Sequence, residues 1–259
     1  MPTSGRRPTS PGGSARTVPV ETRIHFQEEL SALELQALGG LDMVAESLER
    51  TLEAVLHHDV ELAGYVIADD DRIDGRYLEV RQGILSLLAR QAPVATDLRL
   101  IAALLDLIRN FERMGDQCVN ISKLVPLVGR EPPVHPEIIT RIERMMRQAI
   151  SQVQQCKQAF ARRDVELAED LVRQDDEIDR CNREIFALVL ETGDDPDARE
   201  WGMTMMLVAR QIERVGDNAV DIGEQTAFVV TGEFREFTDA SHPDAVPPAI
   251  GLSAGPRGE

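Results

Sequence analysis

The chain has 259 residues, of which 45 are acidic and 28 are basic, so its formal net charge is −17. Such an acidic protein is unsuited to binding nucleic acid or anionic lipid, because both of these need a basic face. No apolar run approaches the roughly eighteen residues of a membrane span. Three cysteines without a C-x-x-C pair exclude a disulfide framework. We therefore expect a reduced, cytoplasmic protein that neither inserts into a membrane nor binds nucleic acid.

Both ends of the chain have the composition of disordered tails. Residues 1–20 and 233–259 are rich in Pro, Gly and Ser. The first of these segments also lacks the apolar region of a secretory signal. The body between them, residues 21–232, carries 40 acidic and 23 basic residues and therefore the whole net charge of −17.

The body has the pattern of a helical protein. Long stretches rich in Leu, Ala, Glu, Arg and Gln favour helices, and the prolines between them mark the breaks. Asp59 and Asp164 suit helix N-caps, and Pro93 suits the first turn of a helix. No segment shows the sustained alternation of a strand. The pattern predicts six long helices over residues 21–58, 59–91, 94–125, 136–162, 164–191 and 197–231.

An internal repeat divides this body in two. The sequence DVELA at residue 59 recurs at residue 164, and DDRID at residue 70 recurs as DDEID at residue 175. Further along, ERMGD at residue 112 recurs as ERVGD at residue 213. Self-similarity on this scale indicates the duplication of one helical unit. We therefore predict an all-α fold of two tandem three-helix bundles, over residues 21–128 and 135–232, joined side by side.

The repeat also preserves acidic residues at a spacing of one helical turn. Four pairs of carboxylates are each separated by four residues, so each pair shares one helix face, where like charges repel. Asn120 and Asp221 extend two of these ladders by another turn. Ladders of oxygen ligands suit hard or borderline divalent cations. The predicted metal-ligating residues are Asp70, Asp74, Glu112, Asp116, Asn120, Asp175, Asp179, Glu213, Asp217 and Asp221.

Residues beside the ladders leave two interpretations open. Gly115 and Gly216 remove a side chain next to a motif aspartate, so a partner helix or a ligand can approach closely. Arg113 and Arg214 could neutralise part of the charge, in which case the ladders are a solvated acidic face. No nucleophile–base arrangement is visible, and we do not expect an enzyme.

Two helical repeats, each with a D-x-x-x-D helix followed by an ERxGD helix, resemble the PhoU family. The segment PVATDLR at residues 93–99 also resembles the family's segment before its first ERxGD, whereas the second copy has DPDAR at residues 195–199. Any role of Asp97 and Arg99 is thus confined to one repeat. The resemblance covers about residues 21–232. It implies two three-helix bundles that bind metal clusters through E/D-x-x-x-D motifs, and Fe, Mn, Mg and Zn are the candidate ions.

The resemblance also implies a function. PhoU proteins are negative regulators of phosphate uptake and of the phosphate-starvation response, and they link the ATPase of a phosphate-specific ABC transporter to a sensor histidine kinase. We expect these partners here, and a homodimer. Two alternatives remain: a carboxylate metalloprotein that is hydrolytic or stores metal, and an accessory protein of a different phosphate permease.

Overall fold

The computed structural model describes residues 20–129, 134–193 and 195–237, and within these ranges it contains helices and no strand. The all-α prediction is confirmed, and every long helix begins and ends within two residues of its predicted bounds. The elements are α1 (Val20–Leu56), α2 (Val60–Arg90), α3 (Ala95–Leu124), the short 3₁₀ helix η1 (Val125–Val128), α4 (Pro136–Arg162), α5 (Val165–Leu190) and α6 (Pro196–Thr231). Most of the predicted tails lies outside the described residues.

The same N-cap starts the second helix of each repeat. Oδ1 of Asp59 accepts a hydrogen bond from the backbone N–H of Leu62 at 2.9 Å. Oδ1 of Asp164 accepts from the backbone N–H of Leu167 at 3.0 Å. Each bond pairs an N–H that the start of a helix leaves without an intrahelical partner. Both predicted caps are therefore confirmed.

A buried aspartate holds the start of α3. Oδ2 of Asp97 accepts a hydrogen bond from the backbone N–H of Val94 at 3.2 Å. Its carboxylate also lies 2.5 Å from Arg23 and accepts a 2.9 Å hydrogen bond from Gln27, both on α1. Asp97 thereby ties the start of α3 to the start of α1. Pro93, predicted in the first helical turn, instead precedes the N-cap residue Val94.

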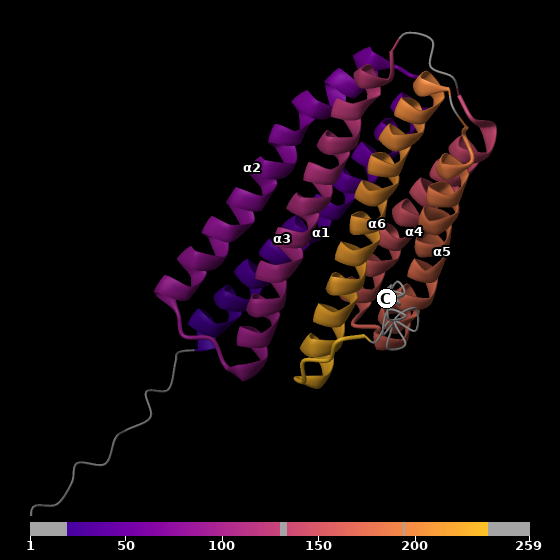
Figure 1. The fold of residues 1–259 in the computed structure, drawn as a ribbon. Helices are drawn as coiled ribbons and strands as arrows, with labels where there is room; N and C mark the ends of the chain where they lie inside the picture. Colours follow the sequence, from indigo (N-terminus) through magenta and orange to yellow (C-terminus); the bar gives the residue numbers. More distant parts are fainter. Residues whose placement is uncertain (1–19, 130–133, 194, 238–259) are drawn as a thin grey trace, which may run out of the picture.

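The six helices form two bundles with one core. Helices α1, α2 and α3 pack together, as do α4, α5 and α6, and the bundles lie side by side (Figure 1). Helix α3 packs against α6, and α1 packs against α4. A single cluster of buried apolar side chains runs through all six helices. The predicted pair of three-helix bundles is present, and the two bundles share their apolar interior.

A small apolar cavity lies at one end of the contact between the bundles. It is lined by side chains of α1, η1, α4 and α6, among them Val55, Val125, Ile139 and Trp201. Trp201 is the only tryptophan of the chain, and only 3% of it is exposed. Apolar side chains from both bundles therefore line this end of the contact.

The chain that leaves α6 folds back onto it. The ring of Phe234 stacks on that of Phe228, with centroids 3.9 Å apart. The backbone N–H of Phe237 donates a 2.7 Å hydrogen bond to Oε1 of Glu224. The prediction that a disordered tail begins at residue 233 is therefore wrong for residues 233–237, because these aromatic rings find partners on α6. Residues 238–259 lie outside the described part of the chain.

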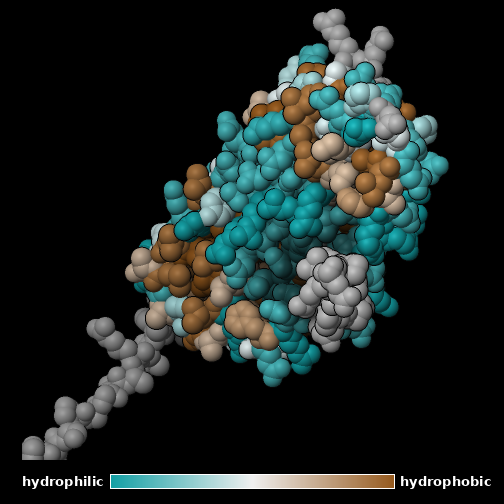
Figure 2. Space-filling model, in the orientation of Figure 1, coloured by the Kyte–Doolittle hydropathy of each residue, from teal (hydrophilic) through white to brown (hydrophobic). Residues whose placement is uncertain are grey.

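The visible surface is hydrophilic over the middle of the helices and has apolar areas near their ends (Figure 2). Leu85, Val94 and Leu98 are exposed where α2 ends and α3 begins, and Phe186 and Leu190 are exposed towards the end of α5. No helix in the described part of the chain combines the length and the apolar character needed to cross a membrane.

One glycine tests the packing of α1 on α3. A Cβ added at Gly40 would lie 2.6 Å from the ring of Phe111. We expect Gly40→Ala to lower the free energy of unfolding by about 1–3 kcal/mol, because the ring has to move in a close-packed core. Gly64→Ala is the control, since a Cβ there meets no atom within 4 Å. Urea unfolding measures both variants, and equal effects would contradict the prediction.

Candidate functional site

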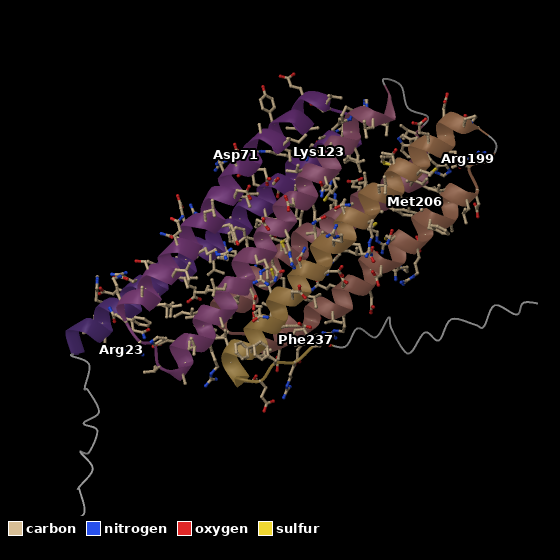
Figure 3. The ribbon with its side chains drawn as sticks, turned by 60° about the vertical axis from the view of Figure 1, so that its left-hand side comes forward. Arg23, Asp71, Lys123, Arg199, Met206 and Phe237 are labelled. Atoms are coloured by element: carbon tan, nitrogen blue, oxygen red, sulfur yellow. The ribbon has the colours of Figure 1, made fainter. Side chains whose placement is uncertain are left out.

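The predicted metal-ligating residues lie on α2, α3, α5 and α6, which stand in front of α1 and α4 in the view of Figure 1. Figure 3 shows side chains of these helices, with Asp71 on α2 and Met206 on α6 as landmarks. We name two groups. The first cluster is Asp70, Asp74, Glu112 and Asp116, on α2 and α3. The second cluster is Asp175, Asp179, Glu213 and Asp217, on α5 and α6.

Each cluster contains a close contact between an aspartate and a glycine. A Cβ added at Gly115 of α3 would lie 2.8 Å from Oδ1 of Asp70. In the second cluster a Cβ at Gly216 of α6 would collide with Oδ1 of Asp175. Because glycine has no side chain, a carboxylate of the neighbouring helix reaches the backbone in both places. The expectation that these glycines allow close approach is confirmed.

The carboxylates of the first cluster repel one another. Burial, followed by the negative charges of Asp74, Asp116 and Glu112, raises the pKa of Asp70 to about 6. Burial also raises the pKa of Glu112, as do Asp116 and Asp74, while Arg113 opposes this rise. Both effects disfavour the charged form of a carboxyl group. The structure therefore brings the four predicted residues of this cluster together from two helices.

The carboxylates of the second cluster also repel one another, but neighbouring Arg and Asn side chains reduce this repulsion. Burial and the charge of Glu213 raise the pKa of Asp217 to about 6; Arg210 lowers it and Asp179 raises it. Oε2 of Glu213 lies 2.5 Å from Nη1 of Arg210. The same oxygen accepts a 2.8 Å hydrogen bond from Nδ2 of Asn182. Charge-assisted bonds of this kind stabilise a carboxylate without any added ion.

The remaining predicted residues have separate surroundings. Oδ1 of Asp175 accepts a 3.2 Å hydrogen bond from Nε2 of Gln152, which lies on α4 and is fully buried. Burial raises the pKa of Asp221, and the charge of Arg113 on α3 opposes the rise. Asp221 therefore lies near the contact between α3 and α6. Asn120 is exposed on α3, one turn beyond the first cluster.

Four polar residues at the second cluster were not predicted: Gln152, Asn182, Arg183 and Arg210. The sequence pointed to Arg214 as the neutralising arginine, but the ion pair with Glu213 is made by Arg210. One signal for Arg210 existed, because an arginine stands three residues before the motif glutamate in both repeats. Gln152 and Asn182 act across helix–helix contacts that a single sequence does not reveal.

The donor chemistry of the clusters fits a hard cation. Carboxylate oxygens from two helices repel one another, and the bound charge of a cation would relieve that repulsion. Within the described residues, no three His, Cys, Asp or Glu side chains are already arranged to hold a metal ion. Binding at either cluster would therefore require carboxylates to turn towards the ion.

The raised pKa of Asp70 predicts how the stability of the metal-free protein depends on pH. Because its pKa is about 6 in the folded state and 3.8 in the reference state, the folded state holds more protons between these pH values. Stability from this group is thus lost as the pH rises through that interval. We expect Asp70→Asn to unfold like wild type near pH 4 and to be more stable by about 1 kcal/mol at pH 7.

Urea unfolding in EDTA at several pH values measures this difference. Glu79→Gln, at an exposed position of the same helix, is the control and should give no pH-dependent gain. A gain for Asp70→Asn that does not grow with pH would contradict the assignment.

Comparison of the sequence and the fold with known proteins identifies the family. The model of the PhoU domain matches residues 41–125 and again residues 142–226, one match within each predicted repeat. The phosphate-specific transport system accessory protein PhoU homolog 1 of Thermotoga maritima is 31% identical over 216 residues, which are 83% of this chain and 93% of that protein. The PhoU homolog of Zymomonas mobilis is 31% identical over 212 residues, 80% of this chain and 87% of its own.

Solved structures give the same result for the fold. The crystal structure of PhoU from Pseudomonas aeruginosa has a TM-score of 0.73 at 27% identity, covering 80% of this chain and 100% of that chain. The phosphate transport system regulatory protein PhoU from Streptococcus pneumoniae also has a TM-score of 0.73, at 26% identity, covering 82% and 99%. With one domain model matched in both repeats, and with relatives alike in sequence and in fold, the chain belongs to the PhoU family.

Proposed function

We propose that the protein is a non-catalytic negative regulator of phosphate uptake and of the phosphate-starvation response. It would act from the cytoplasmic side and link the ATPase of a phosphate-specific ABC transporter to a sensor histidine kinase. The observation that carries this proposal is the PhoU domain in both halves of the chain. Relatives that match more than four fifths of the chain are named as accessory proteins of the phosphate-specific transport system.

The architecture supports a docking role. Six long helices around one apolar core present a rigid surface, and rigid elements hold a binding surface in place better than loops do. Exposed apolar side chains near the helix ends, such as Leu98 and Leu190, offer area for protein contacts. The expected homodimer belongs to this proposal. Regulation would follow if the protein binds one conformational state of its partners better than another.

We also propose that the two clusters bind divalent or iron-type cations, with Fe, Mn, Mg and Zn as candidates. The ligands would be the carboxylates of the first cluster, on α2 and α3, and those of the second cluster, on α5 and α6. A bound cation would supply positive charge that joins the two helices of each pair. The chain's own residues orient these oxygens, since Gly115 and Gly216 admit Asp70 and Asp175 to the helix contact.

A reporter assay tests the regulatory role. In a strain that lacks this gene, an alkaline-phosphatase reporter should be active even in high phosphate, and the wild-type gene should silence it. If the clusters serve signalling, a variant without the four motif acids of α3 and α6 should fail to silence it. That variant is Glu112→Ala, Asp116→Ala, Glu213→Ala and Asp217→Ala.

A matched variant controls for the loss of four negative charges. It replaces four exposed acids outside the clusters, and it should silence the reporter like wild type. Its changes are Glu28→Ala, Glu49→Ala, Glu169→Ala and Glu200→Ala. A reporter that stays silent in the deletion strain would contradict the proposed regulation and would favour a role with a different permease.

A further inference from the structure

The two clusters differ in the placement of their arginines. Each repeat has an arginine three residues before its motif glutamate: Arg109 before Glu112, and Arg210 before Glu213. At this spacing both arginines are able to pair with the glutamate. In the structure Nη1 of Arg210 lies 2.5 Å from Oε2 of Glu213. Arg109 instead has its Nη1 3.6 Å from Oδ1 of Asp106.

One position in the repeat explains the difference. Asp106 lies three residues before Arg109 and offers a carboxylate one turn towards the start of α3. The equivalent residue before Arg210 is Leu207, whose side chain has no hydrogen-bond acceptor. Arg109 is thus paired with Asp106 and not with a carboxylate of the first cluster, whereas Arg210 is paired with Glu213.

The opposite helix adds to the inequality. Asn182 of α5 donates to the second cluster's glutamate at 2.8 Å, and Arg183 lies 3.7 Å from Asp179. The equivalent positions on α2, given the shift of 105 residues, hold Tyr77 and Leu78. Neither of these side chains carries a nitrogen donor. At these two positions α5 supplies nitrogen donors to its cluster and α2 supplies none.

The first cluster has no direct ion pair, and only the nearby charge of Arg113 partly offsets its negative charge. Among the ion pairs of the described residues, none joins a Lys or Arg to a carboxylate of this cluster. Like charges in a partly buried site repel strongly, and ions from solution are then the available source of compensation. In the second cluster an incoming cation would compete with Arg210 for the oxygens of Glu213.

We propose that the two clusters are unequal cation sites: the first binds a divalent cation tightly, and the second binds it weakly because Arg210 acts as a built-in counter-ion. This inference rests on the cation binding put forward as part of the proposed function. The dissociation constants should differ by about tenfold or more, since a cation at the second cluster has to displace a charge-assisted hydrogen bond. Arg210 is in this sense a positioning residue for Glu213.

Titration of the full-length, chelator-stripped protein with Mn²⁺ tests the inequality. Isothermal calorimetry should resolve a tight class and a weak class of sites. The double variant Asp74→Asn/Asp116→Asn should remove the tight class. The double variant Asp179→Asn/Asp217→Asn should remove the weak class.

The repeat supplies a matched pair of variants. Arg210→Gln and Arg109→Gln each remove one positive charge from equivalent, exposed positions. Arg210→Gln should tighten the weak site by about tenfold, because Glu213 loses its internal partner. Arg109→Gln should change the tight site by less than about twofold, because its arginine already faces Asp106. Circular dichroism checks that both variants are folded.

A second pair tests the cause. Leu207→Asp should draw Arg210 away and tighten the weak site, whereas Asp106→Leu should release Arg109 towards Glu112 and weaken the tight site. Equal affinities at the two clusters, or equal effects of Arg109→Gln and Arg210→Gln, would overturn this inference and leave cation binding intact. If none of Mn²⁺, Fe²⁺, Mg²⁺ and Zn²⁺ binds at either cluster, the inference and the proposed cation binding fail together.

Discussion

The contact between α3 and α6 is the feature on which the rest of the structure depends. Each repeat is a three-helix unit, and its third helix has apolar residues on more than the side that faces its own bundle. Packing α3 on α6 buries this surplus and merges the two interiors into one cluster. Both helices are then covered on two sides, so only a narrow strip of each remains exposed. The motif residues Asp116 and Asp217 lie within these strips, whereas Glu112 and Glu213 are partly buried beside them.

The carboxylate clusters work against the stability that this core provides. Half-buried acids such as Asp70 would be less costly if they were neutral, and their raised pKa values express that cost. The duplication nevertheless retains a glycine opposite an aspartate in both halves, at Gly115 and Gly216. Local arrangements that oppose folding are typical of functional sites, because the rest of the fold can bear the cost.

Much of this architecture can be predicted from short patterns in the sequence. Helix bounds follow from prolines and from caps such as Asp59, and the grouping of acids follows from a spacing of one turn on a backbone of known pitch. Contacts between side chains of different helices do not follow in this way. Gln152 reaches Asp175 from α4, and Phe234 finds Phe228 although its segment has the composition of a tail.

The difference between the two clusters also could not be predicted from the sequence. The motif itself is duplicated, so the sequence suggests two equivalent sites. The difference arises outside the motif, where Asp106 faces one arginine and Leu207 precedes the other. The side-chain rotamer and the neighbouring residues decide which of two carboxylates an arginine pairs with. The spacing in the sequence is compatible with either pair.

The position of Trp201 gives the protein an internal optical probe. It is the only tryptophan, it is almost fully buried, and side chains of both bundles surround its cavity. Its emission therefore depends on the polarity at one end of the contact between the repeats. Any event that opens this end and admits water should shift the emission to longer wavelength, so fluorescence can follow bundle separation without an added label.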